Sequence, residues 1–218
     1  MDEKFWEIQI FKGISENSKT KILKMDKKEV YYKSSETLFN EGDEINYFGV
    51  ILDGVLKCTE YTISGKELNS SYFFNGDAFP FYLIYGGASK YNFNIVAFKK
   101  SKVVLLPVVE LKEIIDSDIV FLHNILTFVA EYNCYSKILL RCVQYRRVIE
   151  RLSYWLLNIN EADNIIQIPN SQEVLANILH VNRSSLNQEL VFLERLGVIE
   201  CNRRNIKILD RKYLEDLL

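Results

Sequence analysis

The chain has 218 residues, of which 48% are hydrophobic, and its formal net charge at pH 7 is −2. This length allows one large domain or two small ones, and the hydrophobic fraction excludes a disordered chain. The slightly acidic balance does not favour a protein coated by nucleic acid, although it allows DNA binding through one local surface. The sequence has no apolar run of about 18 residues and no apolar leader segment, so we expect a cytoplasmic protein with no membrane contact.

Short segments rich in Val, Ile, Tyr, Phe and Thr fill the region 28–108. Glycines separate them at wide, fairly regular intervals, at Gly42, Gly54, Gly65 and Gly76. Asp-Gly and Asn-Gly pairs supply the positive φ angles of tight hairpin turns. Strand-sized segments with a turn about every ten residues predict a small antiparallel β-barrel or jelly roll. Together with N-terminal helices, this barrel makes up a predicted domain of residues 1–116.

The next segment, residues 117–144, contains no Gly or Pro and carries apolar residues at helical spacing. An alternating step of three and four residues, typical of a coiled-coil seam, includes Leu122, Ile125, Val129, Tyr132, Ser136, Leu139 and Val143. We interpret this helix as a dimerisation helix, and a helix buried against its own barrel is the alternative. Cys134 and Cys142 also lie here, where buried structural cysteines are more common than a thiol switch.

The last segment, residues 145–218, predicts two helices joined by a short turn. Ser171 is a suitable N-cap for a helix over 172–179, and Asn182 can cap a second helix that continues to about Leu196. Gly197 then ends the second helix, and the sequence "GVIECNRRNIKIL" predicts a strand hairpin after it. This order is that of a winged helix-turn-helix. The predicted fold class is therefore α+β, with a barrel, a long helix and a winged helix-turn-helix.

Polar side chains occupy the outward face of the second predicted helix. These residues are Arg183, Ser184, Ser185, Asn187 and Gln188, and we add Ser171 at the N-cap and Arg203 and Arg204 in the wing. Arginine pairs well with guanine, and asparagine or glutamine with adenine, while wing arginines can reach backbone phosphates. The alternative is a helical hairpin whose outer face is only solvated. We interpret the segment as a reader of double-stranded DNA.

Enzyme and metal chemistry are not favoured by the sequence. His123 and His180 are the only histidines, and none lies within 28–108, where a metal-dependent barrel enzyme would need its ligands. The chain also has no Gly-rich phosphate loop and no nucleophile motif. We therefore expect no enzymatic activity, no metal and no cofactor. The competing function is a sensor module that acts through protein contacts without binding DNA.

The order of parts resembles the Crp/Fnr family of bacterial transcription regulators over nearly the whole chain. The resemblance is carried by "LFNEGDEINYFGVILDGVLKCTEYTISGKE", "FFNGDAF", "RRVIERLSYWLLN" and "VLANILHVNRSSLNQELVFLERLGVI". It implies a homodimer on a palindromic operator, with one recognition helix in each half-site. It also implies RNA polymerase as a further candidate partner and a small-molecule effector in the barrel.

The barrel departs from the cyclic-nucleotide-binding members that the chain resembles. Those members carry a Gly-Glu pair that holds the ribose and a later Arg-Ser or Arg-Thr pair that holds the phosphate. Pro80 and Phe81 stand at the first pair here, and Tyr91 and Asn92 at the second, so cyclic AMP is not the expected effector. The same stretch predicts either an apolar pocket for an unknown effector, a self-filled pocket or ordinary barrel core, from Phe79, Phe81, Tyr91 and Phe93.

The predicted recognition helix also departs from the family it resembles. Arg183 matches the first arginine of the family's reading positions, whereas Ser184 and Gln188 stand where a glutamate and a second arginine are common. The operator is therefore expected to differ from the family's commonest sequence. His180 stands where a turn glycine is usual, which predicts a positive φ angle at a non-glycine residue.

Overall fold

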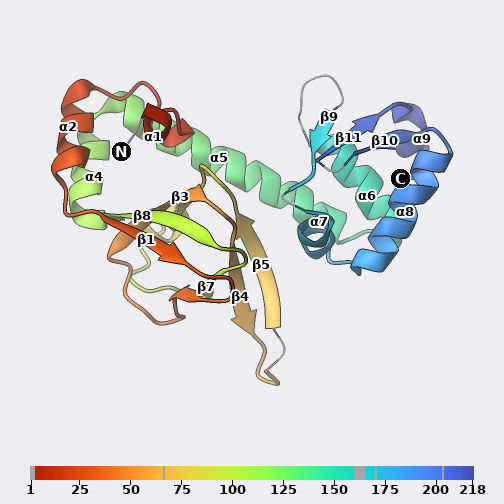
Figure 1. Cartoon of the computed structure of the whole chain (residues 1–218), viewed down its shortest axis with the longest axis horizontal. Helices are drawn as coiled ribbons and strands as arrows, with labels where there is room; N and C mark the ends of the chain where they lie inside the picture. The colour runs from red at the N-terminus through yellow and green to blue at the C-terminus, as the bar shows by residue number, and fades with distance from the viewer. Residues whose placement is uncertain (1–2, 66, 160–164, 170, 203) are drawn as a thin grey trace. The chain divides into compact units, whose positions relative to one another are not determined.

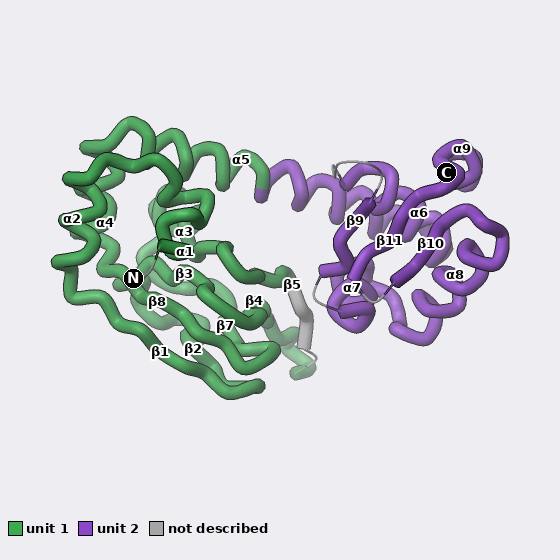
Figure 2. Tube along the Cα trace, turned by 45° about the horizontal axis from the view of Figure 1, so that its top comes forward, with its two compact units in different colours: residues 1–131 green, residues 132–218 purple. Residues whose placement is uncertain are grey.

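A computed structural model describes residues 3–65, 67–159, 165–169, 171–202 and 204–218 (Figure 1). The chain divides into two compact units, Met1–Glu131 and Tyr132–Leu218, which Figure 2 shows in green and purple. The division falls inside helix α5 (Ile119–Cys142), so the predicted long helix over 117–144 contributes residues to both units. Among the described residues, no helix is long and apolar enough to cross a membrane.

Antiparallel strands form the barrel of unit 1. The first sheet of its described part has the order β1 (Lys28–Tyr32), β8 (Ser101–Pro107), β3 (Tyr47–Asp53) and β6 (Ala78–Phe79). The second has the order β2 (Thr37–Phe39), β7 (Asn94–Ala97), β4 (Leu56–Tyr61) and β5 (Glu67–Phe73). The predicted antiparallel barrel is confirmed, and its first and last strands lie within the predicted range 28–108. At the β3–β4 turn, Gly54 has φ +102°, and a Cβ there would collide with Ser101.

Helices cover one end of this barrel (Figure 1). They are α1 (Glu3–Trp6), the 3-10 helix η1 (Gln9–Phe11), α2 (Glu16–Lys24), α4 (Val108–Ser117) and the first part of α5. A further short helix, α3 (Phe81–Tyr85), lies between β6 and β7. Phe11, Ile22, Phe48, Leu111 and Phe121 are fully buried in the core that joins these helices to the first sheet. The core explains why the N-terminal helices belong to the barrel domain.

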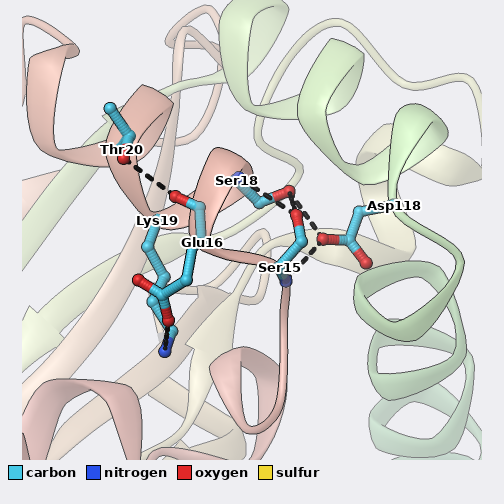
Figure 3. A network of polar contacts seen from close by, with 6 residues as sticks. All are labelled: Ser15, Glu16, Ser18, Lys19, Thr20 and Asp118. Atoms are coloured by element: carbon cyan, nitrogen blue, oxygen red, sulfur yellow. Dashed lines mark hydrogen bonds and ion pairs between the residues drawn. The ribbon is translucent and has the colours of Figure 1, made fainter.

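One carboxylate fixes the start of α5 to the start of α2 (Figure 3). Asp118 is 7% exposed, and its Oδ2 accepts hydrogen bonds from Ser18 Oγ (2.6 Å) and from the backbone amide of Ser15 (2.9 Å). Its Oδ1 accepts from the backbone amides of Val120 and Phe121. Burial alone would raise the pKa of Asp118, but these hydrogen bonds outweigh burial and lower the pKa to about 2. The ionised carboxylate therefore acts as a cap for both helices.

Unit 2 surrounds a separate hydrophobic core. Its elements after α5 are α6 (Val148–Asn158), β9 (Ile165–Gln167), α7 (Gln172–Ile178), α8 (Arg183–Arg195), β10 (Ile199–Cys201), β11 (Asn205–Ile208) and α9 (Arg211–Asp216). The strands form an antiparallel sheet in the order β10-β11-β9. Trp155, Leu186, Leu193 and Leu214 are at most 1% exposed in this core. The predicted helix-turn-helix and hairpin are present, and β9 pairs with β11 as the third strand of the wing sheet.

Candidate nucleic-acid interface

Helices α7 and α8 form a helix-turn-helix pair with local start and stop signals. Ser171 is the N-cap of α7, and its Oγ accepts a hydrogen bond of 3.3 Å from the backbone amide of Val174. Asn182 is the N-cap of α8, but its side chain makes no capping hydrogen bond, in contrast to our expectation. Gly197 follows α8 with φ +71°, a conformation that glycine adopts at low cost after a helix.

The turn between the two helices is closed by backbone hydrogen bonds. The amide of Val181 donates to the carbonyl of Ala176 at 2.9 Å, and Ala176 is 1% exposed. His180 has φ +52°, as predicted from its place in the turn, and its side chain is exposed. On either side, Leu179 and Leu186 are fully buried, which joins α7 and α8 to the same core. The buried leucines thus fix which face of α8 points outward.

Hydrogen-bonding side chains occupy the outward face of the first two turns of α8. Arg183, Ser184, Asn187 and Gln188 are exposed, whereas Ser185 is half-buried. The first turn of α8 contains no acidic residue. The free backbone amides and the partial positive charge of a helix N-terminus favour a nearby phosphate. The structure therefore brings four of the predicted DNA-contacting residues together on one exposed face.

The other predicted DNA contacts differ in their availability. Ser171 is half-buried, and its hydroxyl already accepts the capping hydrogen bond of α7. Arg204 is exposed in the turn between β10 and β11, while its carbonyl accepts a hydrogen bond of 2.7 Å from the amide of Ile168. The side chain of Asn202 shapes this turn by accepting from the amides of Arg204 and Asn205. Arg203 lies outside the residues that the structure describes.

The aromatic residues of the candidate effector pocket are packed into the barrel. Phe79, Phe81, Tyr91 and Phe93 are each at most 3% exposed. The Tyr91 ring stacks on Phe39 at 4.8 Å between centroids, and the Phe81 ring lies 4.3 Å from that of Phe48. Burial raises the pKa of Tyr91, whose hydroxyl has no hydrogen-bond partner within the described part of the chain. These contacts favour the alternative of self-filled barrel core.

The structure corrects one residue of the predicted dimer seam. Ile125 is 2% exposed and belongs to the core of unit 1, so its side chain is not available to a second chain. Leu122 and Val129 are partly buried against the same core, and Leu139 is partly buried against the core of unit 2. Tyr132, Ser136 and Val143 are half-buried. Leu122, Ile125 and Val129 therefore pack against the chain's own barrel domain, which was the alternative to a dimer seam.

A different face of α5 is exposed along its whole length, and we call it the outer face. Its residues are Ile119, Val120, His123, Leu126, Thr127, Ala130, Glu131, Asn133, Cys134, Lys137, Leu140 and Arg141. The large apolar members stand out, because Ile119 is 63% exposed, Leu126 57% and Leu140 64%. The spacing Ile119, Leu126, Asn133, Leu140 is a heptad repeat, one of the rows that a coiled coil buries. Sequence spacing alone did not distinguish this row from the predicted one.

Comparison with protein-family models identifies both units. A model described as a cyclic nucleotide-binding domain matches residues 29–118, which comprise the barrel. A model described as a Crp-like helix-turn-helix domain matches residues 150–217, which include α7, α8 and the wing. The chain belongs to the Crp/Fnr family. It is accordingly a transcription regulator of the Crp/Fnr type, and its C-terminal unit is a helix-turn-helix DNA-binding domain.

Solved structures of similar fold cover most of the chain. FixK2 from Bradyrhizobium japonicum is 17% identical with a TM-score of 0.65, and the match covers 88% of this chain and 96% of that chain. A CooA variant from Carboxydothermus hydrogenoformans is 15% identical with a TM-score of 0.67, covering 88% and 87%. The catabolite activator protein from Thermus thermophilus is 16% identical with a TM-score of 0.51, covering 96% and 97%. Comparison with curated proteins gives no match.

Unit 2 contains two further elements beside the helix-turn-helix and the β10–β11 hairpin. Strand β9 pairs with β11, so that Ile166 lies opposite Ile206 in the wing sheet. Helix α9 begins after Asp210, whose carboxylate accepts a hydrogen bond from the amide of Tyr213. An Asp before a short amphipathic segment is a recognisable N-cap, so this helix had a signal in the sequence. In the described ranges, no group of three His, Cys, Asp or Glu side chains could hold a metal ion.

Proposed function

We propose that the protein acts as a homodimer that binds a palindromic DNA operator through α8, in the cytoplasm and without cyclic AMP as its effector. One copy of α8 would enter the major groove of each half-site. The half-sites of such an operator lie about one helical turn, roughly 34 Å, apart. Contact with RNA polymerase would follow from an operator placed near a promoter.

The observation that carries DNA reading is the chemistry of the exposed face of α8. Arg183 can donate two hydrogen bonds to guanine, and Asn187 or Gln188 can pair with adenine in the major groove. Ser184 is short and can contact either a base or a phosphate. Arg204 lies in the wing, where a long cationic side chain suits a backbone phosphate. No apolar side chain interrupts the exposed residues Arg183, Ser184, Asn187 and Gln188.

The homodimer is proposed to form through the outer face of α5. Large apolar side chains rarely remain exposed in a heptad row unless a second helix covers them. Ile119, Leu126 and Leu140 lie in such a row, and each of these side chains is more than half exposed. This choice replaces the predicted seam, whose Ile125 is already buried.

Cys134 provides a direct test of this dimer because it lies exposed on the outer face. In a parallel pair of helices related by a two-fold axis, the two copies of Cys134 would lie across the seam from each other. Burial raises the pKa of the Cys58 and Cys142 thiols to about 12 and that of Cys201 to about 11, so these thiols react slowly. A short bis-maleimide should therefore link the protein into dimers through Cys134.

The matched control for this cross-link is Cys134→Ser, which should abolish the covalent dimer without changing the mass found by sedimentation. A second variant, Leu126→Glu, should shift the unlinked protein toward monomer. A wild-type chain that sediments as a monomer at all concentrations tested would refute the homodimer.

The residues of the barrel do not fit a cyclic nucleotide. Phe81 and Tyr91 stand at positions where the family's nucleotide-binding members carry a glutamate and an arginine, and both are buried among other aromatic rings. A cyclic phosphate in a barrel needs a charge-assisted partner. Lys90 and Asn92, the polar neighbours of Tyr91, are both exposed. We expect millimolar cyclic AMP to leave the melting temperature unchanged, and a rise of several degrees would contradict this part of the proposal.

Selection of bound sequences from random DNA duplexes tests the function as a whole. The purified protein is offered the pool with and without a metabolite extract, and enriched sequences are read out. A two-fold symmetric sequence that contains guanine and adenine contacts in each half is the expected result. Failure to enrich any sequence under either condition, at low salt, would favour a sensor that acts through protein contacts.

A further inference from the structure

Arg151 on α6 makes three hydrogen bonds to backbone carbonyls of two separate segments of unit 2. Its Nη1 donates to the carbonyls of Leu179 (3.1 Å) and His180 (2.9 Å), in the turn between α7 and α8. Its Nε donates to the carbonyl of Tyr145 (2.8 Å), in the loop between α5 and α6. The guanidinium therefore connects the loop that follows α5 to the turn that precedes the recognition helix.

The helix-turn-helix turn benefits from a cation at this place. The last carbonyls of α7 have no partner within the helix, and a helix C-terminus carries a partial negative charge. Leu179 is the C-cap of α7, and His180 adopts the left-handed conformation that reverses the chain direction. A guanidinium that donates to both carbonyls satisfies these acceptors and fixes the peptide planes of the turn. The direction in which α8 leaves the turn depends on those planes.

The neighbouring arginines of the same loop do not share this arrangement. Arg146 and Arg147 are exposed, and Arg147 is the N-cap of α6, where its amide donates to Glu150 Oε2 at 3.0 Å. Arg151 is half-buried. Burial raises the pKa of the Cys142 thiol, and the positive charge of Arg151 opposes part of that rise. The guanidinium thus acts electrostatically on the last residue of α5 as well as binding the turn.

We propose that Arg151 is a positioning residue that fixes the recognition helix α8 relative to the loop 143–147. This inference rests on the proposed function, since it assigns α8 as the reading helix. Any displacement of the loop would pull on the α7–α8 turn through the guanidinium. Lysine has one ammonium group in place of the planar fork, so it can reach one of these carbonyls but not hold all three.

The test compares Arg151→Met with Arg151→Lys and with the control Arg146→Met. Arg146→Met removes the same charge from an exposed position close by, so it matches any general loss of electrostatic attraction to DNA. Three quantities are measured for each variant: affinity for the selected operator, affinity for a scrambled duplex, and amide hydrogen exchange of the peptide 179–186 without DNA.

We expect Arg151→Met to bind the operator at least about tenfold more weakly than Arg146→Met, a difference of about 1.4 kcal/mol. Its affinity for the scrambled duplex should match that of Arg146→Met. Amide exchange should accelerate in 179–186 while the rest of unit 2 keeps its protection, and Arg151→Lys should be intermediate in both measurements.

Other outcomes separate the two proposals. If the wild type selects no operator, the proposed function fails, and the local exchange of 179–186 still decides whether Arg151 holds the turn. Equal exchange in 179–186 for Arg151→Met and Arg146→Met would overturn the positioning role. Faster exchange throughout unit 2 with unchanged operator preference would also overturn it, because the arginine would then only stabilise the fold. If Arg151→Met does not fold, the comparison of Arg151→Lys with the wild type decides the question.

Discussion

The barrel interior and the exposed face of α8 are the two regions in which a Crp/Fnr protein would meet its ligands, and they differ sharply here. In the barrel, Phe81 and Tyr91 occupy expected ligand positions and are buried against other rings. On α8, Arg183 and Gln188 remain exposed and able to form hydrogen bonds. The contrast supports our proposal that α8 reads DNA and that the barrel holds no cyclic nucleotide.

The difference has a simple physical basis. An aromatic side chain placed inside a barrel gains hydrophobic stabilisation and needs no polar partner for its ring. A polar side chain on an exposed helix face gains nothing for folding, because water already satisfies it. The polar residues of α8 are therefore available for the DNA contacts that we propose, whereas burial is sufficient to account for the aromatic residues of the barrel.

Phe79→Ala should give the largest effect on stability among the variants that test this contrast. The Phe79 side chain is 1% exposed, and its ring lies 5.7 Å from that of Phe73 and 6.3 Å from that of Phe39. Removal of a buried phenyl ring costs about 3–5 kcal/mol of unfolding free energy. Urea denaturation followed by circular dichroism measures this loss, and the variant should keep the wild-type operator preference while folded.

Tyr61→Ala is the matched control for Phe79→Ala, since the Tyr61 side chain is 57% exposed. Its unfolding free energy should change by less than about 0.5 kcal/mol. A similar small change for Phe79→Ala would mean that the barrel interior is not a packed core, and the contrast with α8 would then fail.

Arg183→Ala tests the other side of the comparison. We expect a loss of about 1–3 kcal/mol of binding free energy for each base contact removed, and relaxed preference at one position of each half-site. Competition binding with the selected operator and its single-base variants measures both effects. Arg195→Ala, at an exposed position in the last turn of α8, is the control. If the two variants bound the operator with equal affinity, Arg183 would not be a base-contacting residue.

The sequence predicts the helix-turn-helix better than it predicts which face of α5 is buried. The reason is that the signals of the helix-turn-helix are local in sequence, whereas the partners of α5 are distant. Ser171 and Gly197 act within a few residues of the helices they begin or end, so their effect can be recognised locally. The buried face of α5 depends on partners such as Phe11 and Leu111, which are distant in sequence. Several rows of α5 satisfy a three-four spacing, and only packing decides which row remains exposed.

Strand β1 lies within the predicted barrel range 28–108, but no turn glycine in the sequence marks its ends. β1 (Lys28–Tyr32) has the sequence KEVYY, and its charged residues lie on an exposed strand beside β8. Lys102 pairs with Glu29 at 2.7 Å across this edge, an interaction that spacing along the chain does not reveal. The barrel glycines mark the strands they flank, whereas the pairing of β1 with β8 could be recognised only in the folded structure.

Asp118→Asn should show that the buried polar groups of unit 1 contribute to stability rather than to ligand binding. The pKa of Asp118 is about 2 in the folded chain, below its value of 3.8 in the absence of these contacts. A carboxyl whose folded pKa is lowered stabilises the fold above the unfolded pKa. That stabilisation, on the order of 2 kcal/mol, is lost as the pH falls from about 4 to about 2.

The measurement is urea denaturation of the wild type and of Asp118→Asn between pH 7 and about pH 2. The variant should be less stable at pH 7 and should lack this part of the acid dependence. Asp26→Asn removes an exposed carboxylate from the same unit and serves as the control. An acid dependence that survives unchanged in Asp118→Asn would show that other carboxylates dominate it.

His180→Gly should have the smallest effect, and its direction distinguishes backbone conformation from side-chain contacts in the α7–α8 turn. His180 has φ +52°, a region that costs a non-glycine residue about 1 kcal/mol or more. Glycine removes this cost but adds conformational freedom to the unfolded chain, so the net gain should be about 0.5 kcal/mol. Arg151 donates to the carbonyl of residue 180, which glycine keeps, so operator affinity should not change. A loss of operator affinity in His180→Gly, measured with the same competition assay, would instead give the histidine ring a role at the DNA.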